Sequence, residues 1–384
     1  MQMNKTGKEN TQFLKIKKDS AEKFLKLIKK NYSDENIINK RIKVVHSGAF
    51  VLFPLKMNKE KVNKLIESKV NDLDFEIINA KGELDPNYKF RSIEEALVGE
   101  LPANILDLIP KSYDVIGNIA ILEFEQLNSL SIDKSSLYKK KVAESILKVN
   151  KIVDTVYEKK SEVKGQYRLK DLQPILGEDN PETIHKENNC IFKLDVKNTY
   201  FTPRLVFERK RLSMLKFAKN ELIVDLFAGV GPISIQIAKN NDVTIYSFDI
   251  NPTAHKFLIE NVELNKLKGE VNAYNIDVVD LTKSSNELGN SLKNDVDRII
   301  MNLPEQSINY IDIACFLMKK AGGILHFYQF CEKPNPIEKG IENLKVKLNS
   351  QGWYIENISN SKIVKPFSPK SDLIVVDVNI RYIP

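Results

Sequence analysis

The second half of the chain contains four successive apolar runs with polar residues near their carboxyl ends. They cover residues 222–226, 243–249, 269–277 and 296–304. Short runs rich in branched and aromatic residues are typical of strands buried in a parallel sheet. A single strand-end acid is usually an ordinary cap. Here Asp225, Asp249, Asp277 and Asn302 recur in register, at the edge where open α/β sheets bind ligands, so we expect a ligand site there.

The first of these runs leads into a glycine turn and then a helix. Gly229 and Gly231 permit a tight turn and a close approach to a ligand, and Pro232 suits a first helical turn. Asp249 follows Asp225 by 24 residues, a spacing at which an acid can bind ribose hydroxyls. The loop lacks both the third glycine of a dinucleotide fingerprint and the Gly-Lys-Ser/Thr of a phosphate loop, which disfavours a pyrophosphate ligand.

The remaining apolar pattern completes an α/β domain. A fifth strand is predicted at residues 322–330, a helix within 334–351, and a closing hairpin from 353–358 and 373–380. We therefore predict that residues 196–384 form a mostly parallel seven-stranded sheet. The loop containing residues 365–370 lies near the ligand edge, where contact with RNA and a purely structural role are equally open.

The pattern in the first half of the chain predicts two smaller α+β domains. Within residues 1–75, helical spacing at 20–30 and 59–70 flanks a strand pair at 42–55. Residues 76–90 are charged, contain glycine and proline, and are predicted to be a linker. Residues 91–195 have hairpin character, and we expect them to position RNA for the final domain.

Composition narrows the class of protein. With 384 residues, 42% hydrophobic and 28% charged, the chain has the length for two or three globular domains. It has no apolar run of membrane-spanning length, and its three cysteines are scattered, so we expect no membrane contact, no metal and a cytoplasmic location. The net charge of +7 permits a polyanionic partner without establishing one.

Several short motifs carry further candidate chemistry. They span residues 161–168, 184–188, 200–209, 225–232 and 301–304, in that order along the chain. On charge alone, the Glu-Arg-Lys-Arg sequence at 208–211 would be a salt-bridged exposed helix. Together, however, the motifs resemble those of the archaeal and eukaryotic tRNA (guanine-37-N1)-methyltransferase family.

The resemblance extends from about residue 113 to the C-terminus, and the first domain matches only loosely. It implies a Rossmann-like class I methyltransferase domain that uses S-adenosyl-L-methionine to methylate N1 of the guanosine 3′ to the anticodon. In this family the N-terminal domain contacts the outer corner of the tRNA. A monomer is expected, since three domains can reach one tRNA without a second subunit.

The resemblance also implies roles for individual residues. Glu208 would act as the base that takes the N1 proton, with its pKa raised by partial burial. Arg168 would stabilise charge on O6, Tyr200 would position the base, and the target nucleotide would be flipped out of its stack. Asn302 would hydrogen-bond the guanine edge. The residues implied to bind the cofactor are Asp225, Phe227, Gly229, Gly231, Asp249, Asp277, Asn302, Pro304 and Arg209.

Other functions remain open at this stage. A wyosine-pathway transferase would move the aminocarboxypropyl group of the same cofactor, although the intact motif at residues 200–209 favours methyl transfer. A second activity, methylating carbon in a tricyclic wyosine intermediate, is compatible with the motifs. A small-molecule methyltransferase would leave the upstream domains unexplained, and a non-catalytic RNA-binding protein would leave the cofactor motifs unexplained.

Overall fold

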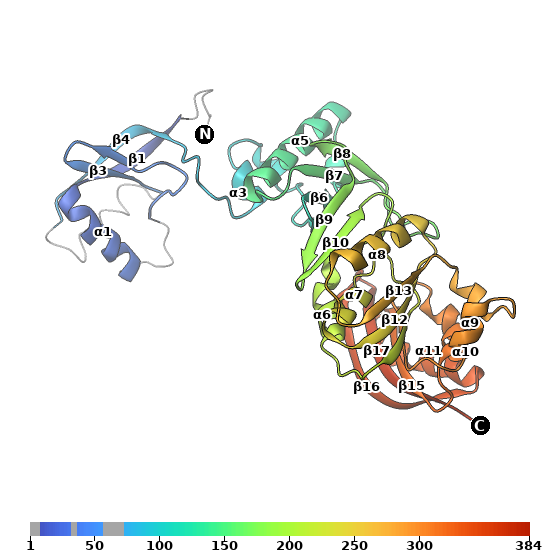
Figure 1. Ribbon diagram of the computed structural model, residues 1–384. Helices are drawn as coiled ribbons and strands as arrows, with labels where there is room; N and C mark the ends of the chain where they lie inside the picture. Colours follow the sequence, from blue (N-terminus) through green and yellow to red (C-terminus); the bar gives the residue numbers. More distant parts are fainter. Residues whose placement is uncertain (1–7, 32–36, 57–72) are drawn as a thin grey trace. The chain divides into compact units, whose positions relative to one another are not determined.

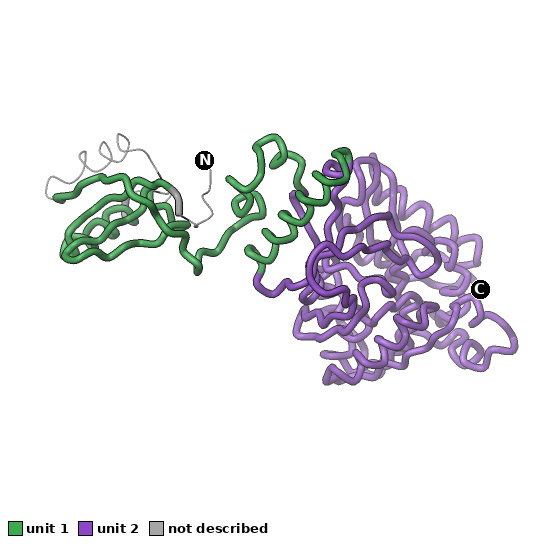
Figure 2. Tube along the Cα trace, turned by 90° about the horizontal axis from the view of Figure 1, so that it is seen from above, with its two compact units in different colours: residues 1–109, 129–150 green, residues 110–128, 151–384 purple. Residues whose placement is uncertain are grey.

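The computed structural model describes residues 8–31, 37–56 and 73–384 (Figure 1). The helix predicted at 59–70 lies outside the described residues. The chain forms two compact units, residues 1–109 with 129–150 and residues 110–128 with 151–384 (Figure 2). Among the described residues, no helix is both long and apolar enough to cross a membrane.

The first unit contains a four-stranded antiparallel sheet in the order β2-β3-β1-β4. The predicted strand pair turns at residues 48–49, one residue later than expected, and Phe24 of the helix packs its ring 5.3 Å from that of Phe53. These contacts confirm the predicted helix and strand pair. The elements are β1 (Lys8–Lys17), α1 (Lys18–Asn31), β2 (Val45–Ser47), β3 (Phe50–Pro54) and β4 (Phe75–Glu83).

The predicted linker at 76–90 is wrong for its first half. Strand β4 pairs with β1 along its whole length, from Phe75 opposite Ile16 to Glu83 opposite Lys8. Its charged residues alternate with half-buried ones, so they mark the solvent face of a strand and not a linker. Gly82 is a packing residue, because a Cβ there would lie 2.5 Å from Ile42 Cγ2.

The predicted domain at 91–195 is also divided differently. Three helices belong to the first unit, and Ser92 caps the first of them by accepting the Glu95 N–H at 3.1 Å. The strands on either side of the longest helix, β6 (Ile119–Leu122) and β7 (Thr155–Lys159), pair in parallel with each other and belong to the second unit. The helices are α3 (Ile93–Leu97), α4 (Ala103–Leu106) and α5 (Ile132–Val149).

A four-stranded sheet and a hairpin open the second unit. The sheet has the order β5-β6-β7-β8, and the hairpin packs on helix α8 (Pro252–Leu264), whose Asn261 side chain bonds both the N–H and the C=O of Lys193. The boundary predicted at 195 therefore cuts through one packed body. The strands are β5 (Asp114–Ile116), β6 (Ile119–Leu122), β7 (Thr155–Lys159), β8 (Leu172–Leu176), β9 (Glu182–Glu187) and β10 (Cys190–Asp195).

The main sheet confirms the predicted seven-stranded α/β fold. Its order is β13-β12-β11-β14-β15-β17-β16, with β17 antiparallel to both of its neighbours. The strand order reverses beside β11, a position at which doubly wound sheets open a ligand crevice. The strands are β11 (Glu221–Asp225), β12 (Val243–Phe248), β13 (Glu270–Tyr274), β14 (Arg298–Met301), β15 (Gly323–Glu332), β16 (Trp353–Pro366) and β17 (Ser371–Tyr382).

Both faces of this sheet are buried, which explains the continuous apolar runs. On β11, Ile223 packs into the core beneath α7 and α8, whereas Val224 packs into the core with α9, α10 and α11. The helices are α6 (Val206–Ser213), α7 (Ser234–Asn240), α8 (Pro252–Leu264), α9 (Glu287–Leu292), α10 (Ile311–Leu317) and α11 (Pro336–Ser350).

Candidate active site

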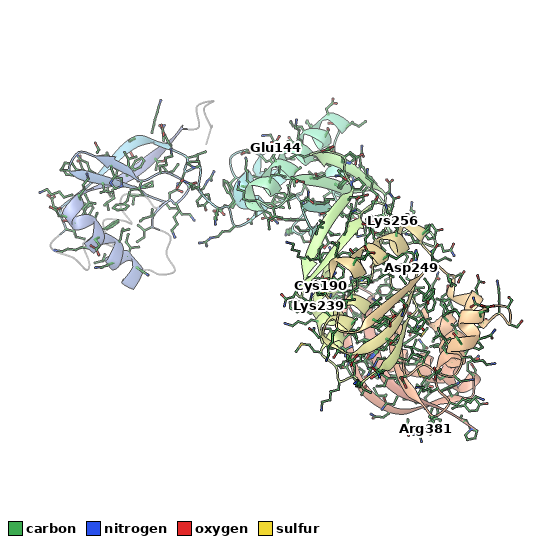
Figure 3. All side chains as sticks on the ribbon, in the orientation of Figure 1. Glu144, Cys190, Lys239, Asp249, Lys256 and Arg381 are labelled. Atoms are coloured by element: carbon green, nitrogen blue, oxygen red, sulfur yellow. The ribbon has the colours of Figure 1, made fainter. Side chains whose placement is uncertain are left out.

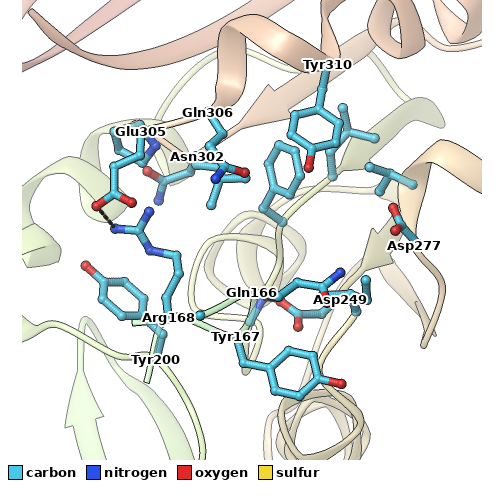
Figure 4. Close-up of a pocket in the computed structure, with 18 of the residues that line it drawn as sticks. Gln166, Tyr167, Arg168, Tyr200, Asp249, Asp277, Asn302, Glu305, Gln306 and Tyr310 are labelled. Atoms are coloured by element: carbon cyan, nitrogen blue, oxygen red, sulfur yellow. Dashed lines mark hydrogen bonds and ion pairs between the residues drawn. The ribbon is translucent and has the colours of Figure 1, made fainter. Parts of the chain in front are cut away.

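A cavity lies at the carboxyl ends of the central strands, as the sequence pattern predicts (Figure 4). All of its lining residues belong to the second unit. The glycine loop after β11, the ends of β12, β13 and β14, and the 165–168 loop all contribute to its wall. The predicted residues that line it are Arg168, Tyr200, Phe227, Gly229, Asp249, Asp277, Asn302 and Pro304.

Asp225 supports the glycine loop from below and does not line the cavity. Its side chain is completely buried, and its carboxylate accepts the Ser234 hydroxyl at 2.8 Å and the Phe227 N–H at 3.4 Å. Burial raises the pKa of Asp225 to about 7, although these two hydrogen bonds oppose the shift. The expected cofactor contact is therefore corrected to an internal support of the loop.

The two glycines of the loop serve different purposes. Both have left-handed backbones, with φ of +57° at Gly229 and +85° at Gly231. A Cβ on Gly229 would have the Tyr200 carbonyl oxygen as its nearest neighbour, at 3.8 Å, so this glycine leaves space beside the cavity. A Cβ on Gly231 would lie 2.3 Å from Leu258 Cδ1, so this glycine serves core packing and does not line the cavity.

Asp249, labelled in Figure 3, ties the end of β12 to the glycine loop through a hydrogen bond. One carboxylate oxygen accepts the Gly229 N–H at 2.7 Å, and the other accepts the Asn251 N–H at 2.8 Å. Burial raises the pKa of Asp249, and the two backbone hydrogen bonds partly offset the rise. The carboxylate is thus held in place at the cavity wall.

The wall beyond Asp249 combines a second acid with aromatic rings. Asp277 accepts the Val279 N–H at 3.1 Å and so caps the 3₁₀ turn Val278–Thr282. The rings of Phe227 and Tyr310 meet edge to face, with centroids 5.1 Å apart. This side of the cavity therefore offers apolar aromatic surface beside carboxylates, which suits a nucleoside.

The segment after β14 is held by its own backbone. Ser307 donates its hydroxyl to the Met301 carbonyl at 3.0 Å and accepts the Leu303 N–H at 3.2 Å. The Pro304 carbonyl accepts the Phe330 N–H at 3.1 Å, which joins the segment to β15. Asn302 therefore lines the cavity from a fixed loop.

Arg168 enters the cavity from a strained turn. Its φ is +56°, an unfavourable value for arginine, and its N–H donates to the Gly165 carbonyl at 3.1 Å. The guanidinium lies 3.0 Å from Glu305 Oε1 and 5.1 Å from the centre of the Tyr200 ring (Figure 4). Burial raises the pKa of Tyr200, so its hydroxyl remains protonated beside this cation.

A group of cations lies beside Arg168. Lys365 lines the cavity, and Arg204 forms a 2.7 Å ion pair with Asp114. Burial lowers the pKa of Lys170 and of Lys365, and the nearby Arg204 lowers both further. This clustering of positive charge is typical of a surface that binds phosphate groups.

Glu208 differs from the expectation in both position and pKa. It does not line the cavity, and its buried carboxylate accepts hydrogen bonds from Arg211 at 2.6 Å and the Tyr328 hydroxyl at 2.7 Å. Lys362 completes the network at 2.8 Å. Burial alone would raise the pKa of Glu208, but these partners outweigh burial and lower it. The predicted raised pKa is therefore wrong.

Arg209 is also buried away from the cavity. Its guanidinium forms a two-point ion pair with Glu187, at 2.5 and 2.6 Å, and donates to the Thr202 carbonyl at 3.1 Å. It thereby holds the 200–205 segment against β9. Cofactor contact, as expected from the motif, is corrected to a structural role.

Some cavity residues were absent from the expected site. Glu305, Gln166, Tyr167 and Tyr310 line it, although none was selected from the sequence. For Glu305, its place directly after Asn-Leu-Pro was a usable signal. Within the residues that the structure describes, no group of three or more acidic, histidine or cysteine side chains is arranged to hold a metal.

Two family descriptions match most of the second unit and part of the first. The TRM5/TYW2 methyltransferase domain matches residues 183–355, and the TYW2 N-terminal domain matches residues 93–180. A tRNA (guanine(37)-N(1))-methyltransferase, Trm5b of Pyrococcus abyssi, is 31% identical over 93% of this chain and 96% of its own. A tRNA(Phe) (4-demethylwyosine(37)-C(7)) aminocarboxypropyltransferase of Pyrococcus horikoshii is 30% identical over 75% of this chain and 96% of its own.

Solved structures agree with these matches. The complex of aTrm5 with tRNALeu has a TM-score of 0.72 at 30% identity, covering 96% of this chain and 99% of that one. Methanocaldococcus jannaschii TYW2 with AdoMet has a TM-score of 0.51 at 25% identity, covering 71% of this chain and all of that one.

The buried Asp225 predicts a pH-dependent effect of Asp225→Asn. Between the model-compound pKa of 3.8 and the folded value of about 7, the folded state keeps a proton that the unfolded state has lost. As the pH rises through this range, the free energy of unfolding of wild type should therefore fall relative to that of the variant, by on the order of 4 kcal/mol. Above the range the difference should stay level. Urea unfolding at a series of pH values measures this. A parallel pH dependence of the two proteins would contradict the assignment.

We expect alanine substitutions at the two loop glycines to lower the stability of the protein by different amounts. Gly231→Ala should lower the free energy of unfolding by about 2–5 kcal/mol, since it adds core overpacking to left-handed strain. Gly229→Ala, the matched control, should cost only about 1–2 kcal/mol of strain. Thermal unfolding of both variants provides the measurement. Equal losses would show that Gly231 is not packed as described.

Proposed function

Because this chain belongs to the TRM5/TYW2 methyltransferase family, we propose that it transfers a methyl group from S-adenosyl-L-methionine to N1 of guanosine 37 in tRNA. The observation that carries this proposal is the similarity of nearly the whole chain to tRNA (guanine(37)-N(1))-methyltransferases. The cavity supports it, since one wall suits the methyl donor and the other suits a guanine.

The donor wall, which contains Asp249, Asp277, Phe227 and Gly229, offers carboxylates and apolar surface that suit S-adenosylmethionine, whose sulfonium supplies an electrophilic methyl group. We assign Asp249 to the ribose hydroxyls and Asp277 to the neighbourhood of the adenine. Phe227, beside Tyr310, gives the adenine an apolar surface. Gly229 leaves the space that a methionine moiety needs at the loop, because no side chain fills it.

The acceptor wall offers groups that match a guanine. We assign Arg168 to O6, where negative charge develops when the N1 proton leaves. Asn302 provides an amide for the guanine edge, and Tyr200 provides a ring that positions the base. Guanosine 37 must leave its stack to enter, and the cations Lys170, Arg204 and Lys365 suit the flanking phosphates.

Aminocarboxypropyl transfer is the second candidate, because a transferase of that type matches 75% of this chain. The methyltransferase match extends over 93% and so includes most of the N-terminal sheet. Methyl transfer is therefore the better supported reaction. Methylation of a wyosine intermediate is a further activity of the same site that we keep open.

We also propose that the chain acts as a monomer in the cytoplasm. The residues that line the cavity lie between Gly165 and Leu373 of this chain, an arrangement compatible with a monomer.

The reaction can be tested with two differently labelled donors. We expect label from the methyl group, and none from the carboxypropyl group, to reach an unmodified tRNA transcript with guanosine 37. A transcript with adenosine 37 serves as the control, and nucleoside analysis should find N1-methylguanosine. Transfer of the carboxypropyl label would establish the second candidate. Labelling of both transcripts would contradict the assigned position.

A further inference from the structure

We propose that Phe367 forms a stacking platform for the base of a nucleotide that flanks guanosine 37, at the Arg168 side of the cavity. The inference rests on the proposed function and deepens it, because it assigns RNA contact to the loop containing residues 365–370. Four observations carry it: the exposure of the Phe367 ring, its stacking on the cavity wall, the rigid turn that holds it, and the neighbouring cations.

Exposed aromatic side chains gather at the cavity. Among the residues that the structure describes, the exposed ones are Tyr167, Phe207 and Phe367, and two of these three lie at the cavity. Phe367 is 54% exposed. Its ring stacks on that of Phe330, which lines the cavity, with centroids 3.9 Å apart and planes inclined by 29°. Phe330 thus covers one face of the Phe367 ring and leaves the other open to a planar ligand.

Phe367 is held on a rigid turn between β16 and β17. Its N–H and that of Ser368 both donate to the Ser371 carbonyl, at 3.1 and 2.9 Å. The Ser368 hydroxyl oxygen accepts the N–H groups of Lys370 and Ser371, at 3.2 and 3.0 Å. The Lys370 carbonyl accepts the Lys333 N–H at 2.8 Å, which joins the turn to the end of β15. Little of the turn has to be ordered when a ligand binds, which lowers the entropic cost of the contact.

The charges beside the platform suit an RNA backbone. Lys365, two residues before Phe367, lines the cavity, and burial lowers its pKa. The neighbouring Arg204 and Arg168 lower the pKa further, and Asp114 only partly opposes them. The cations therefore lie close enough together to bind neighbouring phosphates. A positively charged surface that carries an aromatic ring is the combination by which proteins bind single-stranded nucleic acid.

A nucleotide next to guanosine 37 is the ligand that this position fits. When guanosine 37 leaves its stack to enter the cavity, each neighbouring base loses a stacking partner. The Phe367 ring lies one side chain outside the cavity wall, so it can replace that partner once guanosine 37 is inside. Stacking on an aromatic ring tolerates every base, because each base has a π-face. The contact would therefore serve tRNAs that differ in sequence beside guanosine 37.

A purely structural role for the loop leads to a different expectation. If Phe367 only covered Phe330, replacing it would affect folding and cofactor binding, and the bases around guanosine 37 would not matter. If Phe367 stacks on a base, its replacement weakens the binding only of RNA that carries that base. A double-mutant cycle between the protein and the tRNA therefore separates the two roles.

The test combines Phe367→Leu, which keeps an apolar contact with Phe330, with transcripts that are abasic at position 36 or at position 38. With the intact guanosine 37 transcript, Phe367→Leu should raise the Kd for tRNA, and lower the single-turnover methylation rate at subsaturating enzyme, on the order of 10-fold. With one of the abasic transcripts the substitution should have no effect, since the stacked base is already gone. Phe316→Leu is the matched control and should match wild type, because Phe316 is partly buried beside Lys293 and does not line the cavity.

Phe367→Tyr keeps the ring and should bind tRNA as wild type does, and S-adenosylmethionine affinity should be unchanged in both Phe367 variants. Equal losses with the intact and both abasic transcripts would overturn the inference, as would wild-type tRNA affinity in Phe367→Leu. If leucine disturbed the fold, 2-aminopurine placed in turn at positions 36 and 38 would decide with wild-type protein. Stacking predicts quenched fluorescence at one position in the complex, and unquenched fluorescence at both would overturn the inference. If wild type bound tRNA but made no N1-methylguanosine, the proposed function would fail, and the binding measurements would still test the platform.

Discussion

The hydrogen bond from the Gly229 N–H to the Asp249 carboxylate is the contact on which the cavity depends. It joins the loop after β11 to the end of the neighbouring β12, at 2.7 Å. Parallel pairing alone brings the strand ends to one edge, but it does not determine the path of the loop between them. Asp225 supports the same loop from inside the core, so two carboxylates shape it and only one faces the ligand space.

The sequence could predict the main sheet and the cavity wall at its strand ends because both follow from local patterns. Apolar runs buried on both faces and a glycine turn after the first of them lead directly to β11–β14 and to Asp249 and Asp277. The first domain was harder, because β4 alternates charged and half-buried residues and pairs with a strand far away in the sequence. Its pattern is therefore easily mistaken for a linker.

On the Arg168 side of the cavity, sequence motifs do not determine which charged residues line the wall. Glu208 and Arg209 are adjacent charges on α6, yet each is buried in its own ion-pair network, with Arg211 and with Glu187. Glu305 is an ordinary loop glutamate in the sequence, and its partner Arg168 is 137 residues away. Only the folded chain shows which charges meet and which reach the cavity. The burial of a carboxylate also does not decide its pKa, because cationic partners reverse the shift at Glu208, whereas two hydrogen bonds from neutral donors only oppose it at Asp225.

We propose that one cavity holds the methyl donor against the strand-end carboxylates and leaves the Arg168 side free for the acceptor. A crystal structure of the full chain with S-adenosylhomocysteine tests this most directly. We expect ribose hydroxyls bonded to Asp249, an adenine beside Phe227 and Asp277, and a sulfur atom that faces the space between Asn302 and Arg168. A ligand bound elsewhere, or one whose ribose does not contact Asp249, would contradict it.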